Sequence, residues 1–250
     1  MTTLVDENDP ALADLFSRSQ RVLVLTGAGV SAPSGLPTYR GAGGLYNDTE
    51  IEALHHAEAL PASLDALWGF YGQLRQQVAS VEPNSAHKAI AAWQLATLGQ
   101  GRRFTLATQN IDDLHERASS PQVAHLHGSL YSTCCMDEAC AYGARHDPVA
   151  HLSAPPCPVC GGRLRPAIVL FGERLFGAAE REARLAVRDC DLFVAIGTSA
   201  VVSTALGLLR YATDVGATAV CIDPAPEVDE RFGLHLQDRA ELVLPRLIAT

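Results

Sequence analysis

Short apolar segments alternate with longer amphipathic stretches along most of this chain. Four segments are almost continuously apolar, as expected for strands buried on both faces of a parallel sheet: 21–26, 103–107, 192–196 and 218–222. A fifth strand is expected at 122–126. The stretches between strands are long enough for helices, which we expect at about 84–98, 178–188 and 203–215. This alternation predicts an α/β fold with a doubly wound, parallel, Rossmann-like sheet.

A glycine-rich segment, GAGVSAPSGLPTYR, follows the first predicted strand and ends at Arg40. Gly27 and Gly29 lack a Cβ atom, so the backbone can turn sharply there and approach a ligand. In a plain dinucleotide-binding fold the next residues would begin a helix, but Pro33 and Pro37 disfavour one here. The sequence therefore predicts an extended, mobile flap that can both hold and rearrange an anionic ligand.

Five of the seven cysteines lie between positions 134 and 160, a clustering that indicates zinc in a cytosolic chain. A tetrahedral site needs two pairs of thiolates on tight turns, and Cys157 and Cys160 form a regular second pair. The first pair is less regular, because Cys134 and Cys135 are adjacent and either could join Cys140. Ligand spacing favours Cys135, so the expected ligands of one structural zinc ion are Cys135, Cys140, Cys157 and Cys160.

Polar residues follow two of the predicted strands, at the edge where open α/β sheets bind ligands. The strand at 103–107 is followed by TQNID, and the strand at 122–126 is followed by His127. His127 can accept a proton at neutral pH, although a histidine that bonds only to a backbone carbonyl would fit the same pattern. His125 and Asp113 also stay open as candidates, because the pattern alone does not exclude them.

Composition narrows the classes of function. The chain has 250 residues, 48% of them hydrophobic, which suits one large domain with a small appendage. Its 28 acidic and 19 basic residues give a formal net charge of −9, which disfavours nucleic-acid binding and favours lysine-rich partners. We expect no secretory leader, since the opening residues are acidic and polar, and no membrane span, since no apolar stretch approaches about 18–20 residues. The expectation is a cytoplasmic protein, a monomer or weak oligomer, without nucleic-acid or membrane partners.

Six motifs occur in a fixed order: GAGVSAPSGLPTYR, TQNIDDLHER, HLHGSL, the paired cysteines, RPAIVLFGE and AIGTSAVV. Together they resemble the sirtuin family of NAD-dependent protein-lysine deacylases, and they cover nearly the whole chain. The resemblance implies an NAD-binding domain made of residues 1–40, 81–130 and 166–250. It also implies a smaller domain made of a helical insertion at 41–80 and a zinc-binding insertion at 131–165, with NAD and peptide between the two.

The resemblance also implies roles for individual positions. His127 matches the general base, and Asn110 matches a catalytic position in the nicotinamide pocket. The implied cofactor-binding positions are Gly27, Ala28, Gly29, Arg40, Gln109, Asn110, Ile111, Asp112, Gly197, Thr198, Ser199, Asp223 and Ala240. The implied positions for an acyl-lysine protein or peptide, which would add to the protein as an extended strand, are Tyr71, Leu74, Val169, Phe171, Gly172 and Glu173.

These roles imply a reaction in which NAD is consumed as a co-substrate. The amide oxygen of acyl-lysine attacks the ribose carbon, nicotinamide leaves, and His127 removes a proton from a ribose hydroxyl. That hydroxyl attacks the resulting imidate carbon, and hydrolysis then yields free lysine and O-acyl-ADP-ribose. An ADP-ribosyltransferase or an NAD hydrolase on the same scaffold is the alternative, and a binding module with little activity is a third possibility.

Several positions depart from the family pattern. Tyr39 stands where Phe is usual, Asp223 stands where Asn is usual, and Leu170 replaces a common aromatic residue. Sirtuins that remove succinyl groups resemble FYxxR, in which Tyr and Arg lie on one helical face and grip the distal carboxylate. Here Leu74 occupies the Arg position, and Arg75 stands one residue later. The sequence therefore predicts removal of acetyl or apolar acyl groups in preference to succinyl groups.

Overall fold

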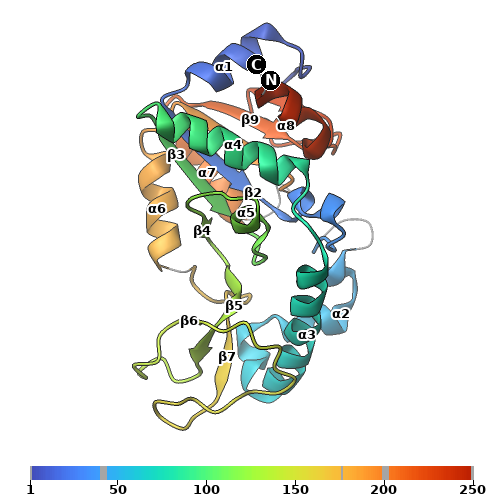
Figure 1. Cartoon of the computed structure of the whole chain (residues 1–250), viewed down its shortest axis with the longest axis vertical. Helices are drawn as coiled ribbons and strands as arrows, with labels where there is room; N and C mark the ends of the chain where they lie inside the picture. Colours follow the sequence, from blue (N-terminus) through green and yellow to red (C-terminus); the bar gives the residue numbers. More distant parts are fainter. Residues whose placement is uncertain (1, 40–43, 176, 199–202, 249–250) are drawn as a thin grey trace.

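The computed structural model describes residues 2–39, 44–175, 177–198 and 203–248. These residues form a large and a small lobe, each built on a sheet (Figure 1). The large sheet is parallel throughout, with the strand order β1-β10-β9-β8-β2-β3-β4. Its strands are β1 (Thr3–Leu4), β2 (Arg21–Thr26), β3 (Arg103–Thr108), β4 (Ala124–His125), β8 (Leu192–Ile196), β9 (Thr218–Ile222) and β10 (Leu234–Leu236). The predicted parallel α/β fold is confirmed.

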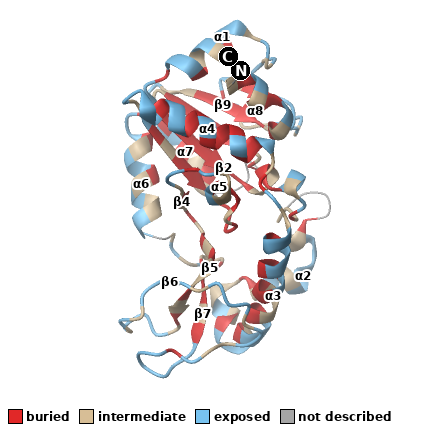
Figure 2. Ribbon diagram, in the orientation of Figure 1, coloured by how far each residue is buried: buried red, intermediate tan, exposed pale blue. Residues whose placement is uncertain are grey.

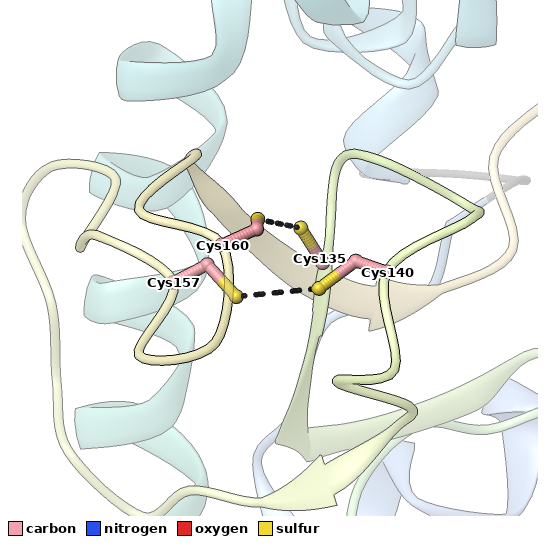
Figure 3. Close-up of side chains that lie close together, drawn as sticks. All are labelled: Cys135, Cys140, Cys157 and Cys160. Atoms are coloured by element: carbon pink, nitrogen blue, oxygen red, sulfur yellow. Dashed lines mark hydrogen bonds between the residues drawn. The ribbon is translucent and has the colours of Figure 1, made fainter.

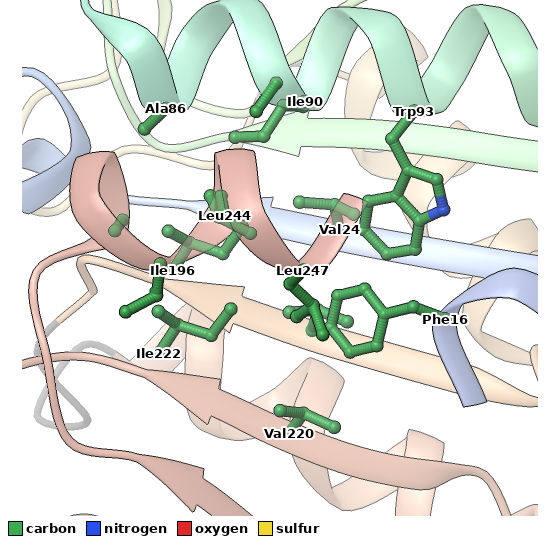
Figure 4. Close-up of a cluster of buried hydrophobic side chains, with 14 of the residues drawn as sticks. Phe16, Val24, Ala86, Ile90, Trp93, Ile196, Val220, Ile222, Leu244 and Leu247 are labelled. Atoms are coloured by element: carbon green, nitrogen blue, oxygen red, sulfur yellow. The ribbon is translucent and has the colours of Figure 1, made fainter. Parts of the chain in front are cut away.

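Helices cover both faces of the large sheet, and β2 shows why. Val22 and Val24 face one side, where they pack in a single cluster with residues of α1 (Pro10–Arg18), α4 (Ser85–Gly99) and α8 (Ala240–Ile248) (Figure 4). Leu23 and Leu25 face the other side, against α6 (Gly177–Val187) and α7 (Ser203–Asp214). Successive strand residues point to opposite faces, so a strand covered on both sides must be apolar throughout. Figure 2 shows the resulting buried sheet.

The small lobe combines helices with a three-stranded antiparallel sheet. Its strands, in the order β6-β5-β7, are β6 (Arg145–His146), β5 (Gly128–Cys135) and β7 (Leu164–Ile168). Its helical part consists of η3 (Leu45–Asn47), α2 (Thr49–Leu54), η4 (Ala57–Ala59) and α3 (Leu60–Ser80). Trp68 of α3 is fully buried and donates a hydrogen bond from Nε1 to the Leu164 carbonyl oxygen at 2.9 Å. This contact joins the helical and cysteine-containing insertions in one core.

The antiparallel sheet lies partly outside the predicted zinc-binding insertion. Strand β5 begins at Gly128, before position 131, and β7 ends at Ile168, after position 165. The division of the chain at 130 and 165 stays a prediction, but these strands show that secondary structure crosses both positions. Among the described residues, no helix combines the length and hydropathy needed to cross a bilayer.

The segment after β2 differs from the extended flap that we expected. It forms two short 3-10 helices, η1 (Ala28–Val30) and η2 (Ala32–Ser34). Prolines exclude a continuous α-helix, but Pro33 is tolerated in the first turn of η2, where its missing N–H is not required. Gly35 then ends the turn with φ at 101°. The extended conformation is therefore wrong for residues 28–34, while Arg40 lies outside the described residues.

The loops after β2 and β8 meet at the carboxyl edge of the large sheet with almost no space between them. Gly29 donates a backbone hydrogen bond to the Gly197 oxygen at 2.8 Å. A Cβ atom on Gly197 would lie 2.5 Å from the Val30 nitrogen, and φ at this residue is +57°. Only glycine meets both requirements without moving the backbone.

We therefore expect Gly197→Ala to lower the free energy of unfolding by about 1–3 kcal/mol, the range for overpacking a close contact. Gly207→Ala is the matched control, because a Cβ atom there has nothing within 4 Å and the position is inside α7. Replacing a helical glycine by alanine should leave stability unchanged or raise it by up to about 1 kcal/mol. Urea unfolding compares the two variants, and equal effects would contradict this account.

Candidate active site

One cavity of about 990 Å³ lies where the two lobes face each other, at the carboxyl edge of the large sheet. This volume is at the upper end of the range for small-molecule sites. Among the predicted cofactor positions that line it are Gly27, Ala28, Gly29, Gln109, Asn110, Ile111, Gly197, Thr198, Asp223 and Ala240. The predicted base and substrate positions that line it are His127, Tyr71, Val169, Phe171, Gly172 and Glu173. Residues from both lobes are thus brought to one site.

Two of the described predicted positions do not line this cavity. Asp112 and Leu74 border a second cavity of about 20 Å³, which shares Ala28, Asn110 and Ile111 with the first. Its volume is about that of one water molecule. Arg40 and Ser199 lie outside the described residues.

The hydrogen bonding of the Gln109 side chain indicates whether a polar ligand such as NAD fits the cavity. Its Oε1 accepts a hydrogen bond from the Thr198 hydroxyl at 2.7 Å. Its Nε2 is buried and has no hydrogen-bond partner in the ranges that the structure describes. Buried amide donors are rarely left unpaired, so a ligand oxygen is the natural acceptor. The Asp223 carboxylate also lines the cavity and accepts from the Ala225 N–H at 2.9 Å, which leaves acceptor capacity for a ribose hydroxyl.

The polar wall of the site is held by hydrogen bonds within the protein. The Asn110 amide nitrogen donates to the Gly27 carbonyl oxygen at 3.1 Å and lies 3.2 Å from the Ser31 hydroxyl. Ser31 in turn donates to the Asp112 carboxylate at 3.0 Å, and the Leu114 N–H donates to its other oxygen. Burial raises the pKa of Asp112, while these two donors act against that shift. The wall is therefore oriented without a ligand.

A second layer of buried polar groups lies behind this wall and was not singled out from the sequence. His87 of α4 approaches the Ser31 hydroxyl at 3.3 Å, and His115 of α5 (Leu114–Arg117) approaches the Thr26 hydroxyl at 2.9 Å. The two imidazoles meet edge to face, with centroids 4.8 Å apart. Burial lowers the pKa of His87 to about 4 and that of His115 well below its usual value. Both rings are therefore neutral at pH 7.

His127 has the hydrogen bonding of a general base. Its Nδ1 lies 2.9 Å from the Gln109 carbonyl oxygen, which can only accept, so Nδ1 carries the proton of the neutral ring. Its Nε2 is then free to take a proton, and burial lowers the pKa of the ring. His125 differs, because Nδ1 contacts the Asn110 carbonyl oxygen and Nε2 contacts Glu116 at 2.7 Å. Burial lowers the pKa of His125, but Glu116, the Asn110 carbonyl oxygen and Asp112 together raise it by more, and the net shift is upward.

The predicted substrate loop is fixed to the small lobe by main-chain bonds. The Phe171 N–H donates to the His55 carbonyl oxygen at 2.7 Å, and its carbonyl oxygen accepts from the Ala57 N–H at 3.0 Å. Glu173 forms an ion pair with Arg165 and accepts from the Leu170 N–H at 2.8 Å. The Glu173 carboxylate therefore stabilises the turn.

Leu74 and Arg75, which stand where the succinyl-binding pattern would place its arginine and the next residue, do not line the large cavity. Tyr71 lines the large cavity, and burial raises its pKa well above the usual value, so the hydroxyl stays neutral. Arg75 is itself part of α3 and is buried, and its Nε donates to the Leu130 carbonyl oxygen at 2.8 Å. Its guanidinium also contacts the Val149 carbonyl and lies 5.4 Å from the Trp68 ring centroid. Arg75 is thus a structural residue of the small lobe.

The four predicted zinc ligands converge at the far end of the small lobe (Figure 3). Their sulfur atoms all lie within 4.8 Å of one another, with Cys135–Cys160 at 3.5 Å and Cys140–Cys157 at 3.8 Å. Sulfurs about 2.3 Å from a tetrahedral zinc ion would be separated by about 3.8 Å. Cys134 lies outside this cluster, because neighbouring residues of β5 face opposite sides of the strand. The cluster supports Cys135 over Cys134.

The fold and the site together define an α/β enzyme class that binds a nucleotide at the sheet's carboxyl edge and carries a structural zinc module. Residues 27–204 match the model of the Sir2 family, and the chain belongs to this family. NAD-dependent protein deacylase 1 of Pseudomonas aeruginosa is 44% identical over an alignment of 246 positions, which covers 95% of this chain and 97% of that protein. The NAD-dependent protein deacylase of Ralstonia nicotianae is 40% identical over an alignment of 252 positions, which covers 99% of each protein.

Solved structures agree with this placement. A crystal structure of a Sir2 homolog–NAD complex matches with a TM-score of 0.88 at 34% identity, covering 99% of this chain and 95% of the other. A Sir2 complex with a deacetylated p53 peptide and 3′-O-acetyl ADP-ribose matches with a TM-score of 0.79 at 26% identity, covering 96% of each chain.

The cysteine geometry predicts different outcomes for two substitutions. Cys157→Ser removes one thiolate ligand, so we expect less than one zinc ion per chain and loss of the β5–β7 sheet, since metal binding stabilises such small modules. Cys134→Ser should keep one zinc ion and native stability, because Cys134 is outside the cluster. Metal analysis and circular dichroism of both purified variants check this. Zinc loss in the Cys134 variant would show that the ligand set is different.

Proposed function

We propose that this Sir2 family member, an NAD-dependent protein deacylase, removes acetyl and other apolar acyl groups from lysine in preference to succinyl groups. The observation that supports catalysis best is the hydrogen bonding of His127, which leaves Nε2 as a proton acceptor in the same cavity as the unpaired Gln109 amide. The relatives named NAD-dependent protein deacylases support the activity class. The p53 complex of a Sir2 relative supports acyl-lysine peptides as substrates.

The residues of this chain divide the work between binding and proton transfer. Bound NAD would supply an electrophilic ribose carbon with nicotinamide as the leaving group. Gln109 Nε2 would donate to a ribose or phosphate oxygen, and Asp223 would accept from a ribose hydroxyl. Asn110 would present an oriented amide to the nicotinamide end of the cavity.

Apolar side chains would keep water from the reacting atoms, and His127 would accept the proton that is released. Ile111, Ile168 and Phe171 line the cavity and would surround the acyl-lysine. His127 would accept a proton from a ribose hydroxyl at Nε2, and Nδ1 would keep its bond to the Gln109 carbonyl oxygen throughout. The resulting imidazolium would be stabilised by that carbonyl group.

The preference against succinyl groups rests on the charges around the cavity. Arg239 is the only arginine or lysine among the described residues that line it, and Arg239 pairs with Glu241. Arg75 does not line this cavity and donates to carbonyl groups of the small lobe, and Leu74, which borders the second cavity, is apolar. A succinyl carboxylate would therefore lose its hydration without gaining a cationic partner.

Mass spectrometry of an acetyl-lysine peptide incubated with NAD tests the activity. We expect loss of the acetyl group with the native enzyme and no product with His127→Ala, which should keep its fold and zinc. Burial lowers the pKa of His127 below the ordinary histidine value of 6.5, so the base form persists to a lower pH than in a free histidine. The acid-side fall of kcat/KM should therefore be centred below pH 6.5. Gain of ADP-ribose by the peptide would indicate a transferase, and nicotinamide release without peptide change would indicate an NAD hydrolase.

Peptides of one sequence that carry acetyl-, butyryl- or succinyl-lysine test the acyl preference. We expect kcat/KM for the succinyl peptide to be at least about tenfold below that for the butyryl peptide, because its buried carboxylate lacks a cation. Leu74→Arg restores the FYxxR spacing and should raise the succinyl value relative to the native enzyme. Faster release of succinyl than of acetyl by the native enzyme would contradict the proposal.

A further inference from the structure

A buried histidine of the small lobe lines the cavity and leaves one ring nitrogen without a partner. His55 follows directly after α2 and is only 2% exposed. Its Nδ1 lies 2.7 Å from the Ile51 carbonyl oxygen. Its Nε2 is buried and has no hydrogen-bond partner in the described part of the chain. An unpaired buried polar atom raises the free energy of the folded protein until a ligand or water pairs with it.

The contacts of the ring determine which nitrogen carries the proton. The Ile51 carbonyl oxygen can only accept, so Nδ1 of His55 donates and Nε2 of the neutral ring is an acceptor. Burial lowers the pKa of His55, and the neighbouring His56 lowers it further. No acidic side chain forms an ion pair with His55 among the described residues. Nε2 of this cavity-lining residue is therefore a neutral acceptor and not a cation.

The surroundings of His55 place this acceptor on the substrate side of the cavity. The ring meets Tyr46, Phe70 and Tyr71, with centroid separations of 5.3, 5.0 and 5.5 Å. Its own carbonyl oxygen holds the Phe171 N–H at 2.7 Å, in the loop that would hold an acyl-lysine peptide. His55, with its unpaired Nε2, thus lies among aromatic side chains on the side of the cavity that an acyl chain would contact.

We propose that His55 selects acyl groups that carry a hydroxyl, such as 3-hydroxybutyryl and lactyl groups, by accepting a hydrogen bond from this hydroxyl at Nε2. The inference rests on the proposed deacylase function and names a substrate class for it. A plain alkyl chain would leave Nε2 dry and unpaired, whereas a hydroxyl donor satisfies it. A succinyl carboxylate has no hydrogen to donate at neutral pH, so it gains nothing from the same atom.

The test compares butyryl and 3-hydroxybutyryl peptides, which differ by one hydroxyl group, with a succinyl peptide of the same chain length alongside. With zinc-loaded enzyme and NAD, we expect kcat/KM for the hydroxylated peptide to exceed that for the butyryl peptide by about three- to tenfold, the effect of one hydrogen bond. A fixed acceptor on one wall should also distinguish the two hydroxyl enantiomers. A ratio of one or less in the native enzyme would overturn the inference.

His55→Phe keeps an aromatic ring against Phe70 and Tyr71 but removes the acceptor, so it should abolish the preference for the hydroxylated peptide. His56→Phe is the matched control and should keep the native ratio, because His56 packs on Phe171 with its ring outside the cavity lining. An unchanged ratio in His55→Phe would overturn the inference. If that variant fails to fold, the native ratio and the enantiomer preference decide.

Two further results separate this inference from the proposed function. Calorimetry of the same peptides, in the presence of ADP-ribose, measures the hydroxyl preference by binding even if no acyl group is released. Absence of release with tighter binding of the hydroxylated peptide would overturn the deacylase function and support the acceptor role of His55. A succinyl peptide that binds more tightly than both others would show that His55 is protonated in the complex, and would overturn the inference.

Discussion

Buried polar groups at the carboxyl ends of β2 and β3 must satisfy one another, and this constraint shapes the rest of the site. Thr26 and Thr108 end the two strands and share a hydrogen bond of 2.8 Å between their hydroxyl groups. The Asn110 N–H donates to the same Thr108 hydroxyl, which fixes the direction in which the loop leaves β3. Since no solvent reaches these groups, any other loop path would leave donors and acceptors unpaired. The loop that carries Gln109 and Asp112 therefore has one conformation available.

Backbone hydrogen bonds also connect the two lobes. The small lobe reaches the large sheet through β5 and through the loop that follows β7, where the Val169 N–H bonds to the His127 carbonyl oxygen at 2.9 Å. The pair of bonds between Phe171 and residues 55–57 then attaches the helical insertion to that loop. The proposed base, the proposed substrate loop and the segment that carries His55 are thus linked by backbone hydrogen bonds, which depend little on side-chain identity. Substitutions of side chains such as Leu74 should therefore leave these bonds in place.

The sequence was sufficient for the central strands, the four cysteines that cluster and most positions that line the cavity. Strands such as 192–196 are continuously apolar and bounded by polar residues, so few other structures fit them. The short strands β1 and β10 gave no such signal, because two or three residues become a strand only through pairing. The histidines at 87 and 115 were missed because helices α4 and α5 bring them together from distant positions. The residues 28–34 were predicted wrongly, because prolines exclude an α-helix yet permit 3-10 turns. His55 was not found, since an unpaired nitrogen has no pattern in sequence.

Strand β5 has His127 immediately before its first residue and Cys135, a predicted zinc ligand, as its last. Its pairing with β7 is regular at Thr133–Cys135, and a one-residue slip there would exchange the two faces of the strand, so that Cys134 would meet the other thiolates. Coordination of zinc through Cys135 would forbid that slip. A zinc ion bound there would therefore fix the register of this end of the strand, and the adjacent cysteine pair marks where the alternative alignment would begin.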